Sequence, residues 1–512
     1  MKIDCSEYDD KHAAFVESLT KELNAIYSAI IRQAVKYGLS VNFDASKGEI
    51  FDFGSFPKLK KRVEQLFADM QSQILALVQN GIVEEWQLAE DKNDYLLEEL
   101  LASTSLAKDE LSAFKVRNRE ALAAFQRRKV GGLGLSDRVW NLTDSFRTEL
   151  ELALDVGLGE GRSASQISRD IRGYLNQPDK LFRRVRDKHG NLKLSKAASA
   201  YHPGQGVYRS SYKNALRLAR TEVNMAYRAA DHERWKEEWF VIGIRIHLSN
   251  NHTLNGKPFH DICDLLEGDY PKAFKFTGWH PQCRCYVTSI LCTDEDFEEY
   301  LQRQREGEDV SGFRFKGEVK EPNDGFKKWV DDNAGRLPGM KSIPYFIADN
   351  WGGHLKDYAR YKSDRHYKDV KFDYMSGGFK ATHSGHNFSK DKGWYEKSVQ
   401  DVGYRNGNAV VLENEPQNEY KKKSCEGTWD GTLFEVAGAE TVTPNNIRNA
   451  LKHCASKPDC EIAVIFFPDE SMISMESIRI GISKYCGLSN TTQYRKFKRI
   501  YFISKDRIVH AQ

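Results

Sequence analysis

The sequence predicts a multidomain protein whose N-terminal regions are mostly α-helical and whose C-terminal region is a small α/β domain. Its 512 residues correspond to roughly three or four domains of about 150 residues. Through residues 1–130 apolar side chains recur at helical spacing, as at Phe15, Leu19, Leu23, Ile26 and Ile30. After residue 370, helix-period segments alternate with short apolar runs that end at turn residues. These patterns predict a helical scaffold followed by an α/β fold.

The composition excludes several classes of protein. Charged residues make up 29% and hydrophobic residues 40% of the chain, and the net charge of +3 implies no general affinity for polyanions. The N-terminus lacks a targeting pattern, and the apolar window at residues 462–467 is too short to span a bilayer, so we expect cytoplasmic synthesis and no membrane partner. Nine thinly spread cysteines suit a reducing compartment.

Three local signals organise residues 130–230. The sequence VGGLG at residues 130–134 supplies backbone freedom and ends the helical N-terminal region, 1–134. Ser163 and Gln166 occupy capping-box positions and predict that a helix starts there. A further helix is predicted by a seam of mostly small residues that permits close packing: Leu216, Ala219, Val223, Ala226 and Ala230.

A basic stretch at residues 179–196 carries seven lysines and arginines against two aspartates. Such a run is able to contact nucleic-acid phosphates. It lacks aromatic partners, however, and a solvated hairpin loop around His189 is the preferred interpretation.

Soft metal ligands concentrate between His252 and Cys285. Cys263 follows His260 by three residues, and Cys283 follows His280 by three. Each pair is able to present an imidazole and a thiolate from a tight turn, and this spacing is typical of a tetrahedral zinc site. The alternative is a chance cluster of buried thiols and surface histidines.

The helix sequence ARTEVN at residues 219–224, with DICD at 261–264 and HPQCRC at 280–285, resembles the phage Mu F-like minor head protein family. The resemblance covers roughly residues 140–290. It implies an α+β head-morphogenesis domain, assigned to residues 135–300, in a virion component that acts in head assembly near the portal. Phage portal and capsid proteins would be its partners, and the host cytoplasm its location during assembly.

The same resemblance implies the metal-binding residues. They would be Cys263, His280, Cys283 and Cys285, with His252 and His260 competing for any remaining role. Four such donors fill a tetrahedral site and leave no position for water, so the expected zinc is structural and clamps the loop.

Residues 301–369 are predicted to be a connector. Residues 302–327 are highly polar and are expected to form a tether, and Phe326 and Val330 indicate a short helix. An extended stretch is expected at residues 343–347, followed by more polar connector up to residue 368.

The last region, residues 370–512, has the pattern of an α/β domain. Residues 394–402 predict a helix that carries Glu396, and residues 409–413 a strand. Residues 429–436 are expected to form a second strand with Asp430 and Glu435 near its ends. A helix that opens at Thr443 and a buried strand at 462–467 complete the order helix, strand, strand, helix, strand.

Histidines and carboxylates in this domain indicate phosphodiester cleavage by one of two routes. In the first, His383 or His386 takes a proton from a ribose 2′-hydroxyl, and Lys380 or a tail arginine stabilises the phosphorane. In the second, three carboxylates hold Mg²⁺: Glu396, Asp430 and Glu435. The structural alternatives are satisfied histidines and an ordinary hairpin turn at Asp430.

Cations alternate with aromatic residues in the tail, which is the pattern of a surface that stacks on bases. The candidate RNA-binding residues are Arg495, Lys496, Lys498 and Arg499, together with Lys380. An amphipathic strand whose charges face water is the alternative.

Residues 370–505 also resemble the C-terminal tRNA nuclease domain of contact-dependent inhibition toxins. The matching positions are Gly377, Gly378, His383, His386, Asn387, Phe388, Tyr395, Glu396, Glu413, Asp430, Gly431 and Glu435. The resemblance implies an RNA substrate, tRNA in particular, and makes a cognate immunity protein a candidate partner. Related nucleases carry a lysine two residues after the second-strand glutamate; here that position is Ala437, unless Lys421, Lys422 or Lys423 supplies the cation.

Two functions therefore remain open for the C-terminal region. It is either an RNA endonuclease carried on a virion protein or a capsid-binding module without catalysis.

Overall fold

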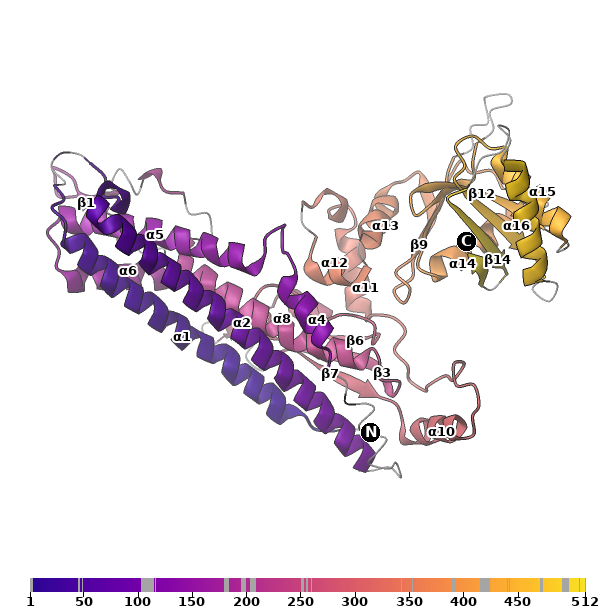
Figure 1. Ribbon diagram of the computed structural model, residues 1–512, viewed down its shortest axis with the longest axis horizontal. Coiled ribbons are helices and arrows are strands. Elements are labelled where there is room, and N and C mark those ends of the chain that lie inside the picture. The colour runs from indigo at the N-terminus through magenta and orange to yellow at the C-terminus, as the bar shows by residue number, and fades with distance from the viewer. Residues whose placement is uncertain are drawn as a thin grey trace. The chain divides into compact units, whose positions relative to one another are not determined.

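The computed structural model of the protein (Figure 1) divides into two compact units. The N-terminal unit comprises Met1–Cys263 and Lys275–Gly317, and the C-terminal unit comprises Asp264–Phe274 and Glu318–Gln512. The structure describes residues 3–511 except 45–46, 48, 103–114, 116, 179–183, 195–198, 203–208, 250–252, 255–256, 259, 342, 352, 389–392, 415–423, 440, 442, 470–472, 490–496 and 506.

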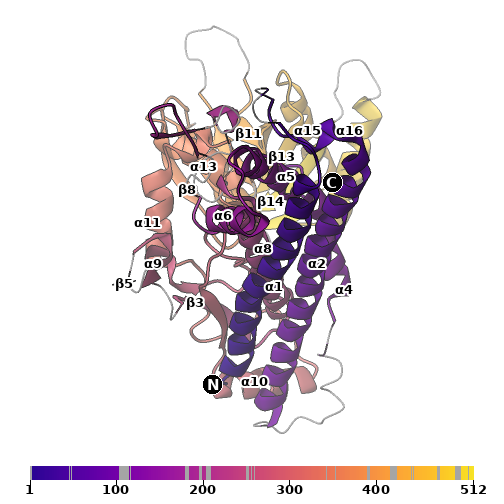
Figure 2. The same ribbon diagram turned by 90° about the vertical axis from the view of Figure 1, so that its left-hand side faces the viewer.

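The N-terminal unit is mostly helical, as predicted. Its long helices are α1 (Ser6–Leu39), α2 (Pro57–Ala102), α5 (Leu135–Gly159) and α8 (Ser211–Trp235). Shorter elements are η2 (Phe53–Ser55), α4 (Arg119–Arg127), α6 (Ala164–Asn176), α10 (Asp294–Arg305) and the strands β1 (Arg184–Arg186), β2 (Leu192–Leu194), β3 (Val241–His247), β4 (Thr253–Leu254), β5 (Lys257–Pro258) and β7 (Tyr286–Leu291). β3 pairs antiparallel with β7. Figure 2 shows α1 and α2 lying side by side along their length.

One hydrophobic core joins the helices on both sides of residue 134. Leu23 of α1, Ile74 of α2, Phe146 of α5, Ile171 of α6 and Val223 of α8 are all buried in it. The five residues of the predicted seam on α8 are all buried. α2 and α8 approach each other closely. A Cβ atom added at Gly81 of α2 would lie only 3.0 Å from the side chain of Val223 on α8. Gly134, where a boundary is expected, is the N-cap of α5, and the helices before and after it contribute to the same core.

Two local predictions in this unit are confirmed. Ser163 caps α6, since its Oγ accepts a hydrogen bond from the Gln166 backbone N–H at 3.4 Å and its own N–H donates to Gln166 Oε1 at 2.8 Å. The basic stretch contains the two-stranded hairpin of β1 and β2, with a turn at residues 188–190. Residues 179–183 and 195–198 of that stretch lie outside the described part of the chain.

The predicted connector contains more helix than expected. The predicted helix near Phe326 is confirmed as α11 (Asp324–Asn333), but the extended stretch predicted at 343–347 is wrong. α12 (Tyr345–Trp351) starts inside that stretch, and α13 (His354–Ser363) occupies the polar segment that follows. Leu355, Tyr358 and Ala359 are buried at i, i+3 and i+4, a period that the surrounding polar residues obscured. η4 (Leu337–Gly339), α9 (Ile262–Leu266) and β6 (Gly268–Tyr270) complete the elements before the large sheet.

The C-terminal unit is α/β, as predicted, and is built on an eight-stranded mixed sheet. Its strands lie in chain order: β8 (Tyr367–Phe372), β9 (Phe379–His383), β10 (Ala409–Leu412), β11 (Gly427–Trp429), β12 (Thr432–Gly438), β13 (Ile462–Phe467), β14 (Arg499–Ser504) and β15 (Ile508–Ala511). β9–β10, β12–β13 and β13–β14 are parallel, and the other pairs are antiparallel. Five strands, β9, β10, β12, β13 and β14, therefore run the same way and end at one edge, called here the carboxyl edge.

Helices cover both faces of this sheet. α14 (Gly393–Arg405) packs Tyr395, Val399 and Val402 onto one face, against residues that include Val410. α15 (Pro444–Ala455) and α16 (Met475–Ser489) pack on the other face, where Leu451 and Ile482 share a core. We call these the α14 face and the α15 face. Among the described residues, no helix is long and apolar enough to cross a membrane.

The single strand predicted at residues 429–436 is wrong. Residues 429 and 432 instead face each other across a two-residue hairpin turn between β11 and β12. Asp430 and Gly431 have positive φ angles of 49° and 76°, which tight hairpin turns require. The hairpin alternative for Asp430 is thus confirmed.

Candidate functional sites

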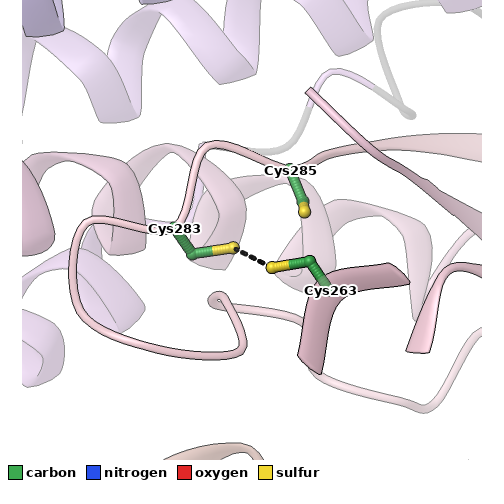
Figure 3. A group of neighbouring side chains, drawn as sticks. All are labelled: Cys263, Cys283 and Cys285. Atoms are coloured by element: carbon green, nitrogen blue, oxygen red, sulfur yellow. Dashed lines mark hydrogen bonds between the residues drawn. The ribbon is translucent and has the colours of Figure 1, made fainter. Parts of the chain in front are cut away.

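Three cysteines converge in the N-terminal unit. Cys263 lies on α9, while Cys283 and Cys285 lie on the segment that leads into β7, and all three side chains are buried. Their sulfur atoms lie within 4.8 Å of one another, and Figure 3 shows Cys263 and Cys283 pointing at each other with Cys285 beside them. The three form a buried cluster that could hold a metal ion such as zinc.

The spacing of the sulfur atoms fits a tetrahedral ion. Cys263 Sγ and Cys283 Sγ are 3.9 Å apart, and two thiolates on one zinc lie roughly 3.8 Å apart because each Zn–S bond is about 2.3 Å. His280 Nε2 is 3.2 Å from Cys263 Sγ, and His280 forms a second group with Cys263 and Asp261. Three of the four expected ligands, the cysteines, therefore lie together. His280, the fourth, contacts one of them, Cys263. Exposed His260 belongs to neither group, and His252 lies outside the described residues.

The surroundings of the cluster favour a thiolate. Hydrogen bonds from the Cys263 and Cys285 thiols, with the charge of Arg228 nearby, hold the pKa of Cys283 well below its usual range. The same contacts, with burial, raise the pKa of Cys263 and of Cys285, so the cluster by itself holds one thiolate. Because thiolates and not thiols ligate zinc, a bound ion would have to displace the protons of the other two.

Arg228 of α8 holds the backbone of the segment that carries Cys283 and Cys285, called here the cysteine segment. The sequence analysis did not predict this role. The guanidinium is buried and donates hydrogen bonds to three backbone carbonyl oxygens: Thr277 at 3.0 Å, Cys283 at 2.7 Å and Cys285 at 2.6 Å. Its position one turn after Asn224 on α8 gave no local signal, since the carbonyls it satisfies lie about 50 residues away. Arg228 thus couples the metal-ligand segment to the helical core.

The adjacent Arg220, Thr221 and Glu222 each reach a different element. Arg220 pairs with Glu17 of α1 at 2.7 Å. Thr221 Oγ1 accepts the backbone N–H of Gln282 at 3.1 Å, inside the cysteine segment. Buried Glu222 pairs with Arg128 and Arg138 at 2.7 and 2.8 Å. The motif ties α1, α5 and the cysteine segment to α8.

In the C-terminal unit, polar side chains gather at the carboxyl edge beside β9 and β10. His383 ends β9, and Tyr367 of β8 lies opposite it in the register. The Tyr367 hydroxyl donates to Glu413 Oε2 at 2.8 Å, and burial, with the Glu413 charge, raises the pKa of that hydroxyl so that it stays protonated. His366, which precedes Tyr367, brings a second imidazole to the same place.

His366 and His383 form a pair with complementary tautomers. Their rings are parallel within 8°, with centroids 6.1 Å apart. His366 Nδ1 lies 2.9 Å from Asp364 Oδ1; because a carboxylate only accepts, Nδ1 carries the proton and Nε2 keeps a lone pair. His383 Nδ1 accepts the Gly385 backbone N–H at 3.0 Å, so its Nε2 carries the proton. In the neutral imidazoles, the Nε2 atom of His366 is therefore an acceptor and the Nε2 atom of His383 is a donor.

The side chains of His386 and Glu396 contact each other, and both are buried. His386 Nε2 is 3.0 Å from Glu396 Oε2, and none of the His386 side chain is exposed. This burial removes His386 from the role of a base that reaches a ribose hydroxyl, which leaves that role to exposed His366 and half-buried His383.

The predicted trio Glu396, Asp430 and Glu435 is not brought together. Glu435 of β12 points to the α15 face, where its Oε1 contacts His453 Nε2 at 3.1 Å and Lys457 Nζ at 2.9 Å. Glu396 lies on the α14 face with His386. Asp430 sits at the opposite edge of the sheet, where Oδ1 accepts the Ala409 backbone N–H at 2.7 Å. No Mg²⁺ site of these three carboxylates is formed.

Of the predicted RNA-binding cations, the three that the structure describes do not line the carboxyl edge. Lys380 is buried between Asp369 and Asp401, each at 2.7 Å, so its charge is neutralised. Lys498 pairs with Glu461 at 2.6 Å, and it lies with exposed Arg499 at the start of β14, the edge opposite to His383. Arg495, Lys496 and Lys421–Lys423 lie outside the described residues.

No protein-family model, curated protein or solved structure matches the chain.

Proposed function

We propose that the protein is a phage minor head protein that acts in head assembly near the portal, and that its C-terminal domain, residues 370–512 with the adjoining His366, is an RNA endonuclease. The histidine pair at the carboxyl edge is the single observation that carries the enzymatic part. The carboxyl ends of parallel strands are where α/β sheets commonly bind ligands, so the position of the pair also suits a substrate site. tRNA is the proposed substrate class and a cognate immunity protein a proposed partner.

The proposed chemistry uses one histidine as base and the other as acid. His366 Nε2 takes the proton of a ribose 2′-hydroxyl, and the 2′-oxygen attacks the adjacent phosphorus. The bond from phosphorus to the 5′-oxygen breaks, and the leaving oxygen is protonated by His383 Nε2–H. For this step His383 is an imidazolium, which has taken a proton from solvent at Nδ1 in place of the contact with the Gly385 N–H. The products are a 2′,3′-cyclic phosphate and a 5′-hydroxyl, and Asp364 orients the base. DNA, which lacks the attacking hydroxyl, is not a substrate.

The head-protein part is supported by the motif at residues 219–224 and by the cysteine segment, which Thr221 of the motif and Arg228, one turn after the motif, contact. In the proposal, Cys263, Cys283, Cys285 and His280 hold a structural zinc ion. The ion joins α9 to the segment before β7 and so preserves the surface that contacts portal and capsid proteins.

Incubation of the full-length protein with total tRNA tests the nuclease proposal. We expect cleaved tRNA with 2′,3′-cyclic phosphate and 5′-hydroxyl ends, in buffer with or without a chelator, and no cleavage of single-stranded DNA. Intact tRNA under all conditions would contradict the proposal and favour a capsid-binding module.

Mass spectrometry of purified particles tests the virion proposal. We expect the full chain to co-purify with heads and to cross-link to the portal protein. A particle that forms normally and lacks this chain would contradict it.

A further inference from the structure

A third group of side chains in the C-terminal unit has the composition of a metal site. His386 follows β9, Glu396 lies in the first turn of α14, and Glu426 immediately precedes β11. One ligand atom from each lies within 4.8 Å of the other two. His386 Nε2 is 3.0 Å from Glu396 Oε2 and 3.8 Å from Glu426 Oε2. Three separate segments thus converge on one point near the carboxyl edge.

The other ring nitrogen of His386 is held as in metal-binding histidines. Nδ1 lies 2.8 Å from the backbone carbonyl oxygen of Glu413, and because a carbonyl only accepts, Nδ1 carries a proton. In the neutral imidazole, the lone pair of Nε2 therefore faces the two carboxylates. A histidine that ligates a metal usually donates its second N–H to a backbone carbonyl or a carboxylate in this way, which fixes the tautomer and the ring orientation.

The three side chains lie in a largely enclosed space. Their exposed fractions are 0% for His386, 11% for Glu396 and 12% for Glu426. A divalent cation bound between the two carboxylates would be attracted by both of them.

We propose that His386, Glu396 and Glu426 bind a divalent transition-metal ion. An imidazole nitrogen beside carboxylate oxygens suits Mn²⁺, Co²⁺ or Zn²⁺ better than Mg²⁺, which prefers oxygen ligands. Three protein ligands leave coordination positions for water or another oxygen donor. The backbone N–H of His386 donates to the carbonyl oxygen of His383 at 3.0 Å, so the ion would hold the turn that carries His383.

Titration of the full-length protein with Mn²⁺ tests this site, with free Mn²⁺ measured by electron paramagnetic resonance. Mn²⁺ is the probe because thiolates prefer softer metals, and no zinc is added because Zn²⁺ would also bind the imidazole and the carboxylates of this site. We expect one Mn²⁺ per chain, bound at least about tenfold more weakly by the Glu396→Gln, Glu426→Gln double variant. Glu435→Gln is the matched control, since it removes a buried carboxylate from the α15 face, and it should bind Mn²⁺ like the wild type.

Circular dichroism shows whether the double variant is folded. If it is not, Glu426→Gln alone decides the question, because it leaves the contact between His386 and Glu396 in place. Equal Mn²⁺ binding by the wild type and the folded variant would overturn the proposal. Absence of binding to the wild type would also overturn it.

The outcome is independent of the proposed nuclease because the titration contains no RNA. Bound Mn²⁺ with intact tRNA would support the metal site and contradict the nuclease. Cleaved tRNA without Mn²⁺ binding would do the reverse.

Discussion

Arg228 on α8 donates a hydrogen bond from Nη2 to the backbone carbonyl oxygen of Cys285 at 2.6 Å. This contact joins the helical core of the N-terminal unit to the segment that carries two of the clustered thiols. Because the same guanidinium also holds Thr277 and Cys283, a single side chain determines the conformation of the segment.

Arg228→Ala is expected to destabilise the N-terminal unit by about 3–5 kcal/mol, because it leaves three buried carbonyl groups without their charged donor. Urea unfolding followed by the helical signal at 222 nm measures the change. Arg303→Ala is the matched control; its partner Glu299 is exposed, and its loss should cost less than about 1 kcal/mol. Similar unfolding midpoints for the two variants would show that the brace does not matter.

Zinc binding should depend on cluster cysteines and not on buried cysteines in general. By elemental analysis we expect Cys283→Ser to hold one zinc per chain fewer than the wild type, and Cys292→Ser to hold as much zinc as the wild type. Cys292 is a suitable control because it is equally buried in the same unit and lies outside the metal-ligand groups of the described residues. A chelator should lower the thermal midpoint of the wild type and of Cys292→Ser by more than that of Cys283→Ser. An equal zinc content in Cys283→Ser and in the wild type would rule out the proposed clamp.

Cleavage of tRNA should depend on both members of the histidine pair. His366→Asn and His383→Asn are each expected to lower the rate by at least about 100-fold, because each removes one of the two proton transfers. His453→Asn, on the α15 face beside Glu435, is the control and should cleave at the wild-type rate. Full activity of either pair variant in a single-turnover assay would exclude the mechanism.

The N-terminal unit should lose stability as the pH rises from about 6.5 to about 8. Burial, with Glu84 nearby, raises the pKa of Glu85 to about 8, and burial lowers the pKa of its partner His12 to about 3. Both groups are thus neutral near pH 7. The folded state keeps a proton on Glu85 that the unfolded chain has already released, so deprotonation removes roughly 1–2 kcal/mol over this interval.

Glu85→Gln should flatten this dependence without abolishing it, because burial also raises the pKa of Glu151 and of Glu238 to about 7. Exposed Glu64→Gln, on the same helix α2, is the control and should keep the slope. Unfolding midpoints at pH 6.5 and pH 8 measure both. An unchanged slope in Glu85→Gln would assign the effect to other groups. Below about pH 6.5 the effect of His12 on stability is opposite to that of Glu85. The unfolded chain gains a proton on His12 there, whereas the folded state keeps that imidazole neutral, so this residue lowers the stability as the pH falls.

Local patterns in the sequence predicted those features that depend on neighbours along the chain. The helical period identified the buried seam of α8, and the capping box identified the start of α6. Cys283 and Cys285 are two residues apart, so their common segment was evident, and Cys263 joined them as expected.

The tertiary structure decided which distant side chains meet. Pairing of β8 with β9 places His366 beside His383, and the α14 crossover brings Glu396 to His386. Successive side chains of a strand point to opposite faces of the sheet, so the position of Glu435 within β12 decides its face. It points to the face opposite Glu396, although both were predicted for one site. Periodicity encodes the face that an element buries, whereas strand order and register, which depend on the packing of the whole chain, determine the partners on that face.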